Sequence, residues 1–330
     1  MNGLKLGGSK KMALRSFMTN YNFVVSFVLL LIAAVAVNPS FLRWNNISNL
    51  FVQGTIVGIV AMGMSMIVSA GMIDISVGAQ VALISGLGVL VLNQTGSVFV
   101  MLLFCCALGG LIGLFNGLLV AKGKMAPMIA TLAMQSICRS IITQLGQGGP
   151  FTVSNENYES FRLIAASGFQ LTEKVRLPYM MIIFCIVSFG FAVTMDRTKF
   201  GKHVYAVGSN ETAAWLAGIN VHRIKIAVFV ITGLMSGVAS LLYASRLTAI
   251  QASNAGLNFE MDAIAAVAIG GTAMSGGRGK IMGTFLGILM FRMINNILTM
   301  ANVPPFLSGL VSGIIIIVAV LMQNFQNKKR

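Results

Sequence analysis

The feature that most constrains this chain is a succession of long apolar runs between residues 21 and 323. A transmembrane helix needs about 20 predominantly apolar residues, and the sequence supplies such a run repeatedly. With 56% hydrophobic and 9% charged residues, the composition excludes an ordinary soluble domain. We therefore predict an all-α, polytopic membrane protein with about ten transmembrane helices. The predicted spans are residues 21–37, 49–70, 74–92, 98–121, 127–145, 178–195, 224–245, 254–271, 281–300 and 305–323.

The charged residues indicate how these spans are oriented. The chain has 23 Lys and Arg residues against 8 Asp and Glu residues, a formal net charge of +15. We exclude nucleic-acid binding because the basic residues lie in loops between spans and not along one soluble face. Most fall in alternate loops, a pattern typical of the cytoplasmic side of a membrane protein. We therefore predict cytoplasmic N- and C-termini and basic loops that lie against an anionic lipid surface.

This topology divides the chain into parts. The cytoplasmic N-terminal segment, the transmembrane domain and the basic cytoplasmic tail are residues 1–20, 21–323 and 324–330. Within the domain, residues 146–177 form an outer loop and residues 196–223 form a cytoplasmic loop. The N-terminal apolar run also resembles a signal peptide, but it is longer than usual and further apolar runs follow it. We therefore interpret it as an uncleaved first span.

Two places in the predicted topology are irregular. The eighth span has a short apolar core, Ala263–Ile269, and crosses the membrane only if residues 254–262 contribute. A re-entrant segment would move basic residues outside, which the charge rule disfavours, so we retain a span. The second and third spans meet at Ala70–Asp74 with almost no loop. This is either a tight turn or a broken helix.

Glycines spaced by four residues recur within the spans, as at Gly109, Gly113 and Gly117 and at Gly233 and Gly237. Such spacing puts the glycines on one face of a helix and lets a second helix approach closely. It predicts a compact bundle and says little about function.

The cytoplasmic loop contains a small structured element. Ser209 and Asn210 are good N-caps, and Gly218 is a good helix stop. The helix between them has about two turns, too few to be stable alone in water. Trp215 and Leu216 are the kind of side chains that anchor a helix on a partner, so we predict a docking helix. Its candidate residues are Gly208, Ser209, Asn210, Glu211, Ala213, Ala214, Trp215 and Gly218.

Motifs for nucleotide binding and hydrolysis are absent from the sequence. It lacks GxxxxGK[ST], so the chain has no phosphate-binding loop of its own. It also lacks HExxH, and we interpret His203 and His222 as surface loop residues. The four cysteines lie in apolar segments without a CxxC pair, as packing residues do. We predict no catalytic residue, no metal site and no cofactor bound by this chain.

Ionisable residues at or within the spans are functional candidates. For Asp74, in Asp-Ile-Ser at a helix start, we weigh capping about two to one over substrate contact, and Glu260 and Asp262 similarly open the eighth span. Arg292 lies mid-span at a cost of about 3 kcal/mol, so we expect it in a polar cavity or at a subunit interface. Arg139 either snorkels to the headgroups or lines a pathway. The candidate pathway residues are Asp74, Ser76, Asn116, Gln135, Arg139, Glu260, Asp262, Arg292, Asn295 and Asn296.

Segments spread over nearly the whole chain match one family pattern in order. They are Gly71-Met72-Ile73-Asp74-Ile75-Ser76-Val77-Gly78, Phe115-Asn116-Gly117, Ile129-Ala130-Thr131-Leu132, Ala206-Val207-Gly208-Ser209-Asn210-Glu211-Thr212-Ala213-Ala214, Leu216-Ala217-Gly218-Ile219, Glu260-Met261-Asp262-Ala263-Ile264, Gly270-Gly271-Thr272 and Gly276-Gly277-Arg278-Gly279. With these segments the sequence resembles the permease subunits of ribose-type bacterial ABC importers. It departs from the pattern in one extra residue at Met72 or Ile73, and in Arg292, where a small or apolar residue is usual.

The resemblance implies a non-catalytic permease subunit in the bacterial cytoplasmic (inner) membrane. Its solute would be a monosaccharide such as ribose, another sugar or an autoinducer-2-like molecule. Its partners would be a second permease copy or a homologous permease, ABC ATPase subunits that bind ATP and Mg²⁺, and an extracytoplasmic solute-binding protein. The helix at residues 209–218 would be the coupling helix that inserts into the ATPase.

A stand-alone secondary transporter or channel for a small polar solute is the rival hypothesis. Breaks at residues 70–74 and 254–262 would suit ion sites, and Asp74 could relay protons. Against it, only three acidic residues lie near the membrane and none lies clearly mid-span. An intramembrane enzyme would need a paired acid and base or a metal set that the sequence lacks.

Overall fold

The computed structural model describes residues 22–317 except 173–174, 305–306, 308, 312 and 315–316. The predicted segments 1–20 and 324–330 lie outside the described residues, as does much of the tenth predicted span, 305–323. The helices are α2 (Asn22–Val37), α3 (Trp44–Ser69), α4 (Val77–Thr95), α5 (Val98–Ala121), α6 (Pro127–Gly146), α7 (Asn155–Ala166), α8 (Tyr179–Arg197), α9 (Lys199–Ser209), α10 (Glu211–Leu216), α11 (Val221–Leu247), α12 (Phe259–Ile269) and α13 (Ile281–Met300), with a 3-10 helix at Pro39–Leu42.

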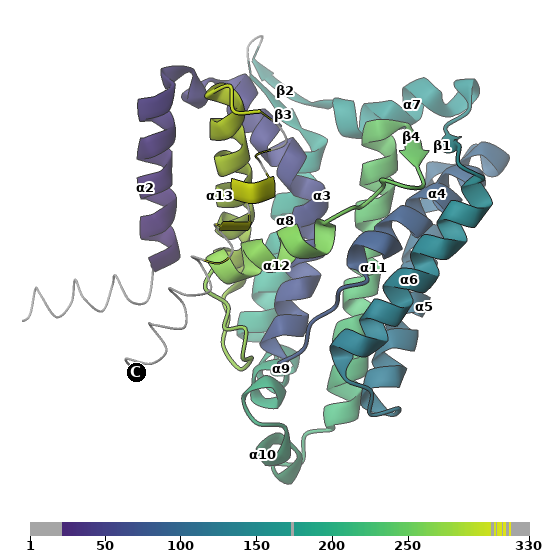
Figure 1. Cartoon of the computed structure of the whole chain (residues 1–330), viewed down its shortest axis with the longest axis vertical. Helices are drawn as coiled ribbons and strands as arrows, with labels where there is room; N and C mark the ends of the chain where they lie inside the picture. The colour runs from purple at the N-terminus through teal and green to yellow at the C-terminus, as the bar shows by residue number, and fades with distance from the viewer. Residues whose placement is uncertain are drawn as a thin grey trace, which may run out of the picture.

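The long helices confirm the membrane-protein class. Within the described residues, six helices are long and apolar enough to cross a membrane, namely α3, α4, α5, α8, α11 and α13. The helices α5 and α13 cover the predicted spans 98–121 and 281–300 residue for residue. Sustained hydrophobicity is the strongest signal in such a sequence, which explains why these boundaries were predictable. Figure 1 shows α10 at one end of the molecule, hereafter the α10 end, and the short strands at the opposite end, the strand end.

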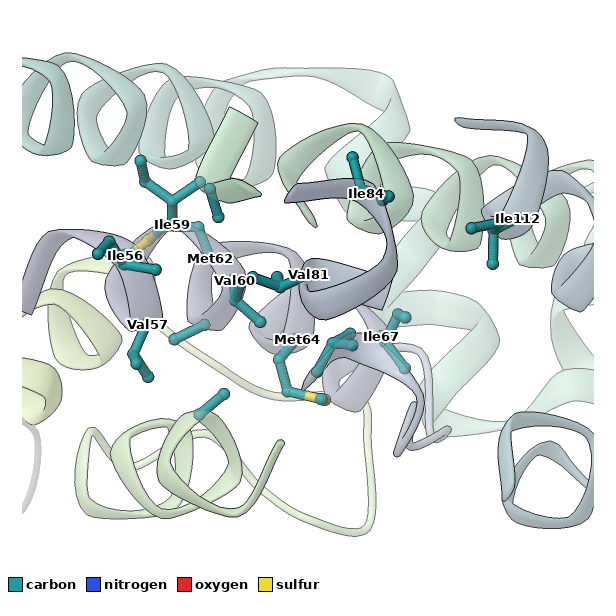
Figure 2. Packing of buried hydrophobic residues seen from close by; sticks show 14 of the residues in the cluster. Ile56, Val57, Ile59, Val60, Met62, Met64, Ile67, Val81, Ile84 and Ile112 are labelled. Carbon is teal, nitrogen blue, oxygen red and sulfur yellow. The ribbon is translucent and has the colours of Figure 1, made fainter. Parts of the chain in front are cut away.

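Helix α3 forms the centre of the bundle. Of its most apolar window, 83% is buried, against 28% for the corresponding windows of α5 and α8. It packs against α8, α11, α12 and α13. Figure 2 shows Ile59, Met62 and Met64 of α3 in one cluster with Val81 and Ile84 of α4. Its neighbours therefore shield α3, while α5 and α8 present large apolar faces to the surroundings.

The predicted close packing at glycines is confirmed between α5 and α11. A Cβ added at Gly109 would clash with the carbonyl oxygen of Gly233, and one added at Gly113 would clash with that of Phe229. A Cβ at Gly237 would likewise clash with the carbonyl oxygen of Cys105. The backbones of these two helices can approach this closely because no side chain separates them.

The junction between the second and third predicted spans is a broken helix. Helix α3 ends at Ser69. Just beyond it Gly71 has a φ of 78°, and Met72 N donates to Ile67 O over 3.1 Å. This is a Schellman ending. The chain then runs without helix to Val77, where α4 begins, and Figure 1 shows it rising from the lower end of α3 towards the start of α4.

The eighth predicted span, 254–271, is corrected by the structure. Helix α12 has 11 residues, a rise of about 16 Å, which is roughly half the thickness of a bilayer core. The residues before it form turns in which Gly256 and Asn258 have φ values of 64° and 63°. The segment still crosses the molecule, from a strand at residues 249–251 to Gly277, whose N–H bonds Ser69 at the end of α3. It does so mostly as irregular chain and a short helix that lies across its neighbours in Figure 1.

The predicted outer loop, residues 146–177, contains elements that the all-α prediction missed. Strand β1 (Pro150–Thr152) pairs antiparallel with β4 (Ala249–Gln251). Strand β2 (Gly168–Thr172) pairs antiparallel with β3 (Val175–Pro178), and helix α7 lies between β1 and β2. The β1–β4 pair ties this loop to the chain that leads from α11 to α12.

Candidate functional site

The predicted cytoplasmic loop contains two helices, α9 and α10. Ser209 is the last residue of α9, so its prediction as an N-cap is wrong. Asn210 is the N-cap of α10: its φ is −160°, and its side-chain oxygen accepts a hydrogen bond from Ala213 N. The extended backbone at Asn210 separates the two helices within a single residue. Helix α9 was missed because its basic residues obscured the buried positions Val204 and Val207.

Helix α10 presents two large apolar side chains outwards. Trp215 is 65% exposed and Leu216 is 73% exposed, as the docking prediction requires. Ala214, predicted as a docking residue, is buried within the chain at 4% exposure. The predicted stop is confirmed, because Gly218 has a φ of 81° and Ile219 N donates to Ala214 O over 3.0 Å.

The start of α10 is also tied to α11. Glu211 in the first turn of α10 forms an ion pair of 2.7 Å with Lys225 of α11. A carboxylate at this position also complements the positive end of the helix dipole. Because the Glu211 side chain is 56% exposed, the pair contributes little to stability, about 0–1 kcal/mol. The ion pair therefore mainly orients α10 relative to α11.

The end of α9 meets both chain breaks at one contact, which we call the glycine junction: Gly71, Gly208, Gly276 and Gly277. A Cβ added at Gly208 would clash with Ser69 O and lie 2.8 Å from Gly277 N. Gly277 N in turn donates to Ser69 O over 2.9 Å. Three backbone segments therefore touch here without intervening side chains.

Tyr205 adds a side-chain bond beside the glycine junction. Its hydroxyl donates to Gly279 O over 3.0 Å. Burial raises the pKa of Tyr205 to about 12, so the phenol keeps its proton at any physiological pH. Helix α9 is thus fixed both to the end of α3 and to the loop that follows α12.

Four polar residues gather at the start of α4, and we call them the Ser76 cluster: Asp74, Ser76, Gln80 and Asn116. All four are buried, with exposures of 1% or less. Asp74 Oδ1 accepts from Ser76 N over 2.8 Å and from Ser76 Oγ over 2.5 Å. Ser76 Oγ also accepts from Gln80 Nε2 over 2.7 Å and from Asn116 Nδ2 over 3.1 Å.

Asp74 is not the N-cap of α4: that position is Ser76, and no side chain caps the helix. The Asp74 carboxylate instead accepts from the N–H of Ser76, two residues on, as in a local turn. The cluster also brings Ser76 and Asn116 together from positions 40 apart in the sequence. The sequence analysis missed Gln80. Its signal was a lone amide one turn after Ser76 in an otherwise apolar run, on the same helix face.

The first turns of α4 and α12 touch each other. A Cβ added at Gly78 would clash with Glu260 Oε2 and with Gly256 O. Glu260 is buried at 7% exposure, and it lies with Asp262 in the first turn of α12, as predicted. Carboxylates are favourable at helix N-termini. The first turn of α4 therefore meets the acidic first turn of α12 inside the bundle.

Arg292 forms an ion pair with Asp262, with 3.3 Å between Nη2 and Oδ2. The side chains are 17% and 24% exposed. The predicted polar environment for Arg292 is thus a carboxylate of the same chain, on the neighbouring helix α12. This partner offsets the cost of placing an arginine within an apolar span.

The remaining pathway candidates lie elsewhere. Arg139 Nη1 donates to Ala252 O over 3.1 Å and to Ala255 O over 2.8 Å, so it holds the turns before α12. Gln135 is half-buried one turn earlier on α6. Asn296 exchanges amide hydrogen bonds of 2.9 and 3.2 Å with Asn46, near the start of α3. Asn295 is on the same turn of α13. These asparagines lie at the opposite end of α3 from the Ser76 cluster.

Among the residues that the structure describes, no group of three or more His, Cys, Asp and Glu side chains is placed to hold a metal ion. The described arrangement is a bundle with one polar cluster at a helix break and one exposed apolar pair on a short helix.

Comparisons with known proteins identify a family and relatives of the chain. Residues 46–320 match the family model described as branched-chain amino acid transport system / permease component. The chain is 40% identical over 300 residues to a ribose import permease protein of Bacillus subtilis, with 91% of each chain covered. It is 33% identical to one of Haemophilus influenzae, covering 95% of this chain and 96% of the relative. An L-arabinose transport system permease protein of Escherichia coli is 33% identical, with 94% and 92% covered.

No solved structure matches the chain. The family model nevertheless spans most of the described helices, from the first turn of α3 to beyond α13. The chain therefore belongs to the family of branched-chain amino acid transport system permease components.

Proposed function

We propose that this chain is the membrane-spanning permease subunit of an ATP-driven ABC importer and that it translocates a monosaccharide, ribose or a similar sugar. Relatives named as ribose, galactose or methyl galactoside, and L-arabinose permeases align over more than 90% of this chain. The observation that carries the mechanism is the exposed Trp215–Leu216 pair on a short capped helix. A helix of this length needs a partner to stabilise it.

The partner that fits is an ATPase subunit. The sequence has no phosphate-binding loop, so ATP and Mg²⁺ would bind to another chain, and this chain would contribute no catalytic residue. Helix α10 would insert into a cleft of that chain with Trp215 and Leu216 as anchors. The α10 end would then be cytoplasmic and the strand end extracytoplasmic. A solute-binding protein would dock on the strand end, and a second permease copy or a homologous permease would complete the importer in the bacterial inner membrane.

The glycine junction connects a movement of α10 mechanically to the two chain breaks. Asn210 joins α10 directly to α9, and Gly208 of α9 rests on Ser69 and Gly277. A displacement of α9 by the ATPase would therefore push on the break that leads to α4 and on the loop that leads to α13. Rigid-body movement of packed elements is a common way to open and close a transport path.

Replacing both Trp215 and Leu216 by alanine tests this proposal. We expect the double variant to lose co-purification with the ATPase and at least about thirty-fold of ATP-driven uptake in proteoliposomes, because central apolar anchors each contribute about 2 kcal/mol or more. Phe189→Ala is the matched control, since Phe189 on α8 is 72% exposed but far from α10 in sequence.

Retained co-purification and uptake in the double variant would contradict the coupling role of α10. Uptake by the purified chain alone, driven by a proton or sodium gradient, would instead support a secondary transporter.

A further inference from the structure

Three oxygen atoms of the Ser76 cluster are buried and have no hydrogen-bond partner among the described residues: Asp74 Oδ2, Gln80 Oε1 and Asn116 Oδ1. Their side chains are 1% exposed or less. Buried polar atoms in native proteins are nearly always paired. All three atoms are acceptors, so the cluster lacks a set of hydrogen-bond donors.

The bonds at Ser76 fix the direction of both amides. The single Ser76 Oγ proton is donated to Asp74 Oδ1 over 2.5 Å. The other contacts of this oxygen, 2.7 Å to Gln80 and 3.1 Å to Asn116, must therefore come from donors. Both amide nitrogens face Ser76, so both amide oxygens face away from it. The unpaired acceptors are a consequence of the network and not of an arbitrary amide orientation.

The three acceptors all lie around Ser76 Oγ. The oxygen and nitrogen of one amide, like the two oxygens of one carboxylate, are about 2.3 Å apart. Each unpaired oxygen belongs to a group that bonds Ser76 Oγ directly, so all three lie within about 6 Å of that atom. The unpaired acceptors therefore belong to one local site.

We infer that the Ser76 cluster is a transit site that binds the hydroxyl groups of a neutral, polyhydroxylated solute. This inference rests on the proposed transport function and adds its recognition chemistry. Each solute hydroxyl donates one hydrogen bond, so a solute with several hydroxyls can pair with more than one of these acceptors. The Asp74 carboxylate repels a phosphorylated or acidic solute, so the site disfavours anions.

The structure also indicates how such a site opens. Asp74, Ser76 and Gln80 belong to the break and the first turn of α4, whereas Asn116 belongs to α5. The Ser76–Asn116 bond of 3.1 Å is the link in the cluster that joins two separate helices. The break begins at the glycine junction, where α9 packs. A shift of α9 moves Ser76 relative to Asn116 and admits solute between them.

Paired changes in protein and solute test this inference. The permease and its ATPase are reconstituted in proteoliposomes, and ATP-driven uptake of D-ribose and of each of its monodeoxy derivatives is measured with one common binding protein. Because wild type and variants receive solute from the same binding protein, its own preference cancels when their uptake ratios are compared. We expect Gln80→Met to lower D-ribose uptake about ten-fold. It should also reduce the preference for D-ribose over at least one monodeoxy derivative, because the variant lacks the amide oxygen that accepts from the missing hydroxyl.

Asn116→Leu removes a second acceptor and serves where Gln80→Met does not insert or assemble. Ser85→Ala is the control, because Ser85 is a buried hydroxyl of α4 that bonds its own helix at Ala82 O; its preference should equal that of wild type. A preference for D-ribose over every derivative that stays at the wild-type value in an assembled Gln80→Met or Asn116→Leu variant overturns the inference and leaves the proposed function standing. A wild-type complex that takes up no sugar overturns the proposed function, and the inference with it.

Discussion

The chain ends two helices in the same way and then continues differently. After α3, Gly71 has a φ of 78° and Met72 N donates to Ile67 O; after α12, Gly271 has a φ of 84° and Thr272 N donates to Val267 O. The bonds are 3.1 and 3.2 Å long. Both endings are Schellman motifs, and both lead through irregular chain to the next helix, α4 or α13.

The segments that follow these endings do different work. Residues 72–76 bring in Asp74 and Ser76, which bury polar atoms beside α5. Residues 272–280 bring in Gly276 and Gly277, whose backbones contact α9. Residues 72–76 therefore supply polar side chains to a buried cluster, whereas residues 272–280 supply a backbone surface on which α9 packs. Shared backbone geometry does not determine function; the side chains placed just after it do.

The largest effect is expected at the point where the two breaks touch. Gly208→Ala would push a Cβ into Ser69 O and Gly277 N, and overpacking of this kind costs up to about 3 kcal/mol. We expect a matching loss of thermal stability in detergent and loss of ATP-driven uptake. Gly190→Ala on α8 is the control, because nothing lies within 4 Å of its Cβ and alanine favours a helix by about 1 kcal/mol. Equal stability of the two variants would show that the glycine junction is not tightly packed.

A smaller effect should distinguish how α12 and α13 are held together. Arg292→Leu leaves Asp262 without its cation, and breaking a fully buried pair costs about 3–5 kcal/mol. Because both side chains are partly exposed, we expect about 2 kcal/mol by chemical denaturation. The double variant with Asp262→Asn should recover most of this loss. A double variant as unstable as Arg292→Leu alone would contradict the ion pair as the cause.

The smallest effect tests the likeness of the two endings directly. Gly71→Ala and Gly271→Ala each place a Cβ at a positive φ, which costs about 1–2 kcal/mol for an L-residue. Asparagine at either position should cost less, since it tolerates this conformation. We expect the two alanine variants to lose equal thermal stability. Unequal losses would show that one ending is strained by its surroundings and the other by its backbone alone.

The length of the apolar runs predicted the long helices well but did not predict where the chain is irregular. The spans that became α5 and α13 were predicted to the residue, because about 20 apolar residues leave little choice. The short length of α12 was not predicted. It depends on Asn258 adopting a positive φ, and the sequence does not reveal that choice.

Only the local part of the candidate site was predictable from the sequence. Asp74 and Ser76 are two residues apart, so the bonds between them follow from local turn rules. The meeting of Ser76 with Asn116 and of Asp262 with Arg292 depends on how the helices pack. Gln80 was missed because a single amide in an apolar run has no pattern around it.

The central position of α3 has a consequence for how the protein is made. The four helices that pack most against it, α8, α11, α12 and α13, all follow it in the chain, and none begins before Tyr179. During synthesis α3 must therefore reside in lipid, or with the insertion machinery, before these four helices exist. Helix α3 can remain in lipid during this time, because no acidic or basic residue lies between Trp44 and Ser69. The most enclosed helix of the finished protein is also one that can enter the bilayer unaccompanied.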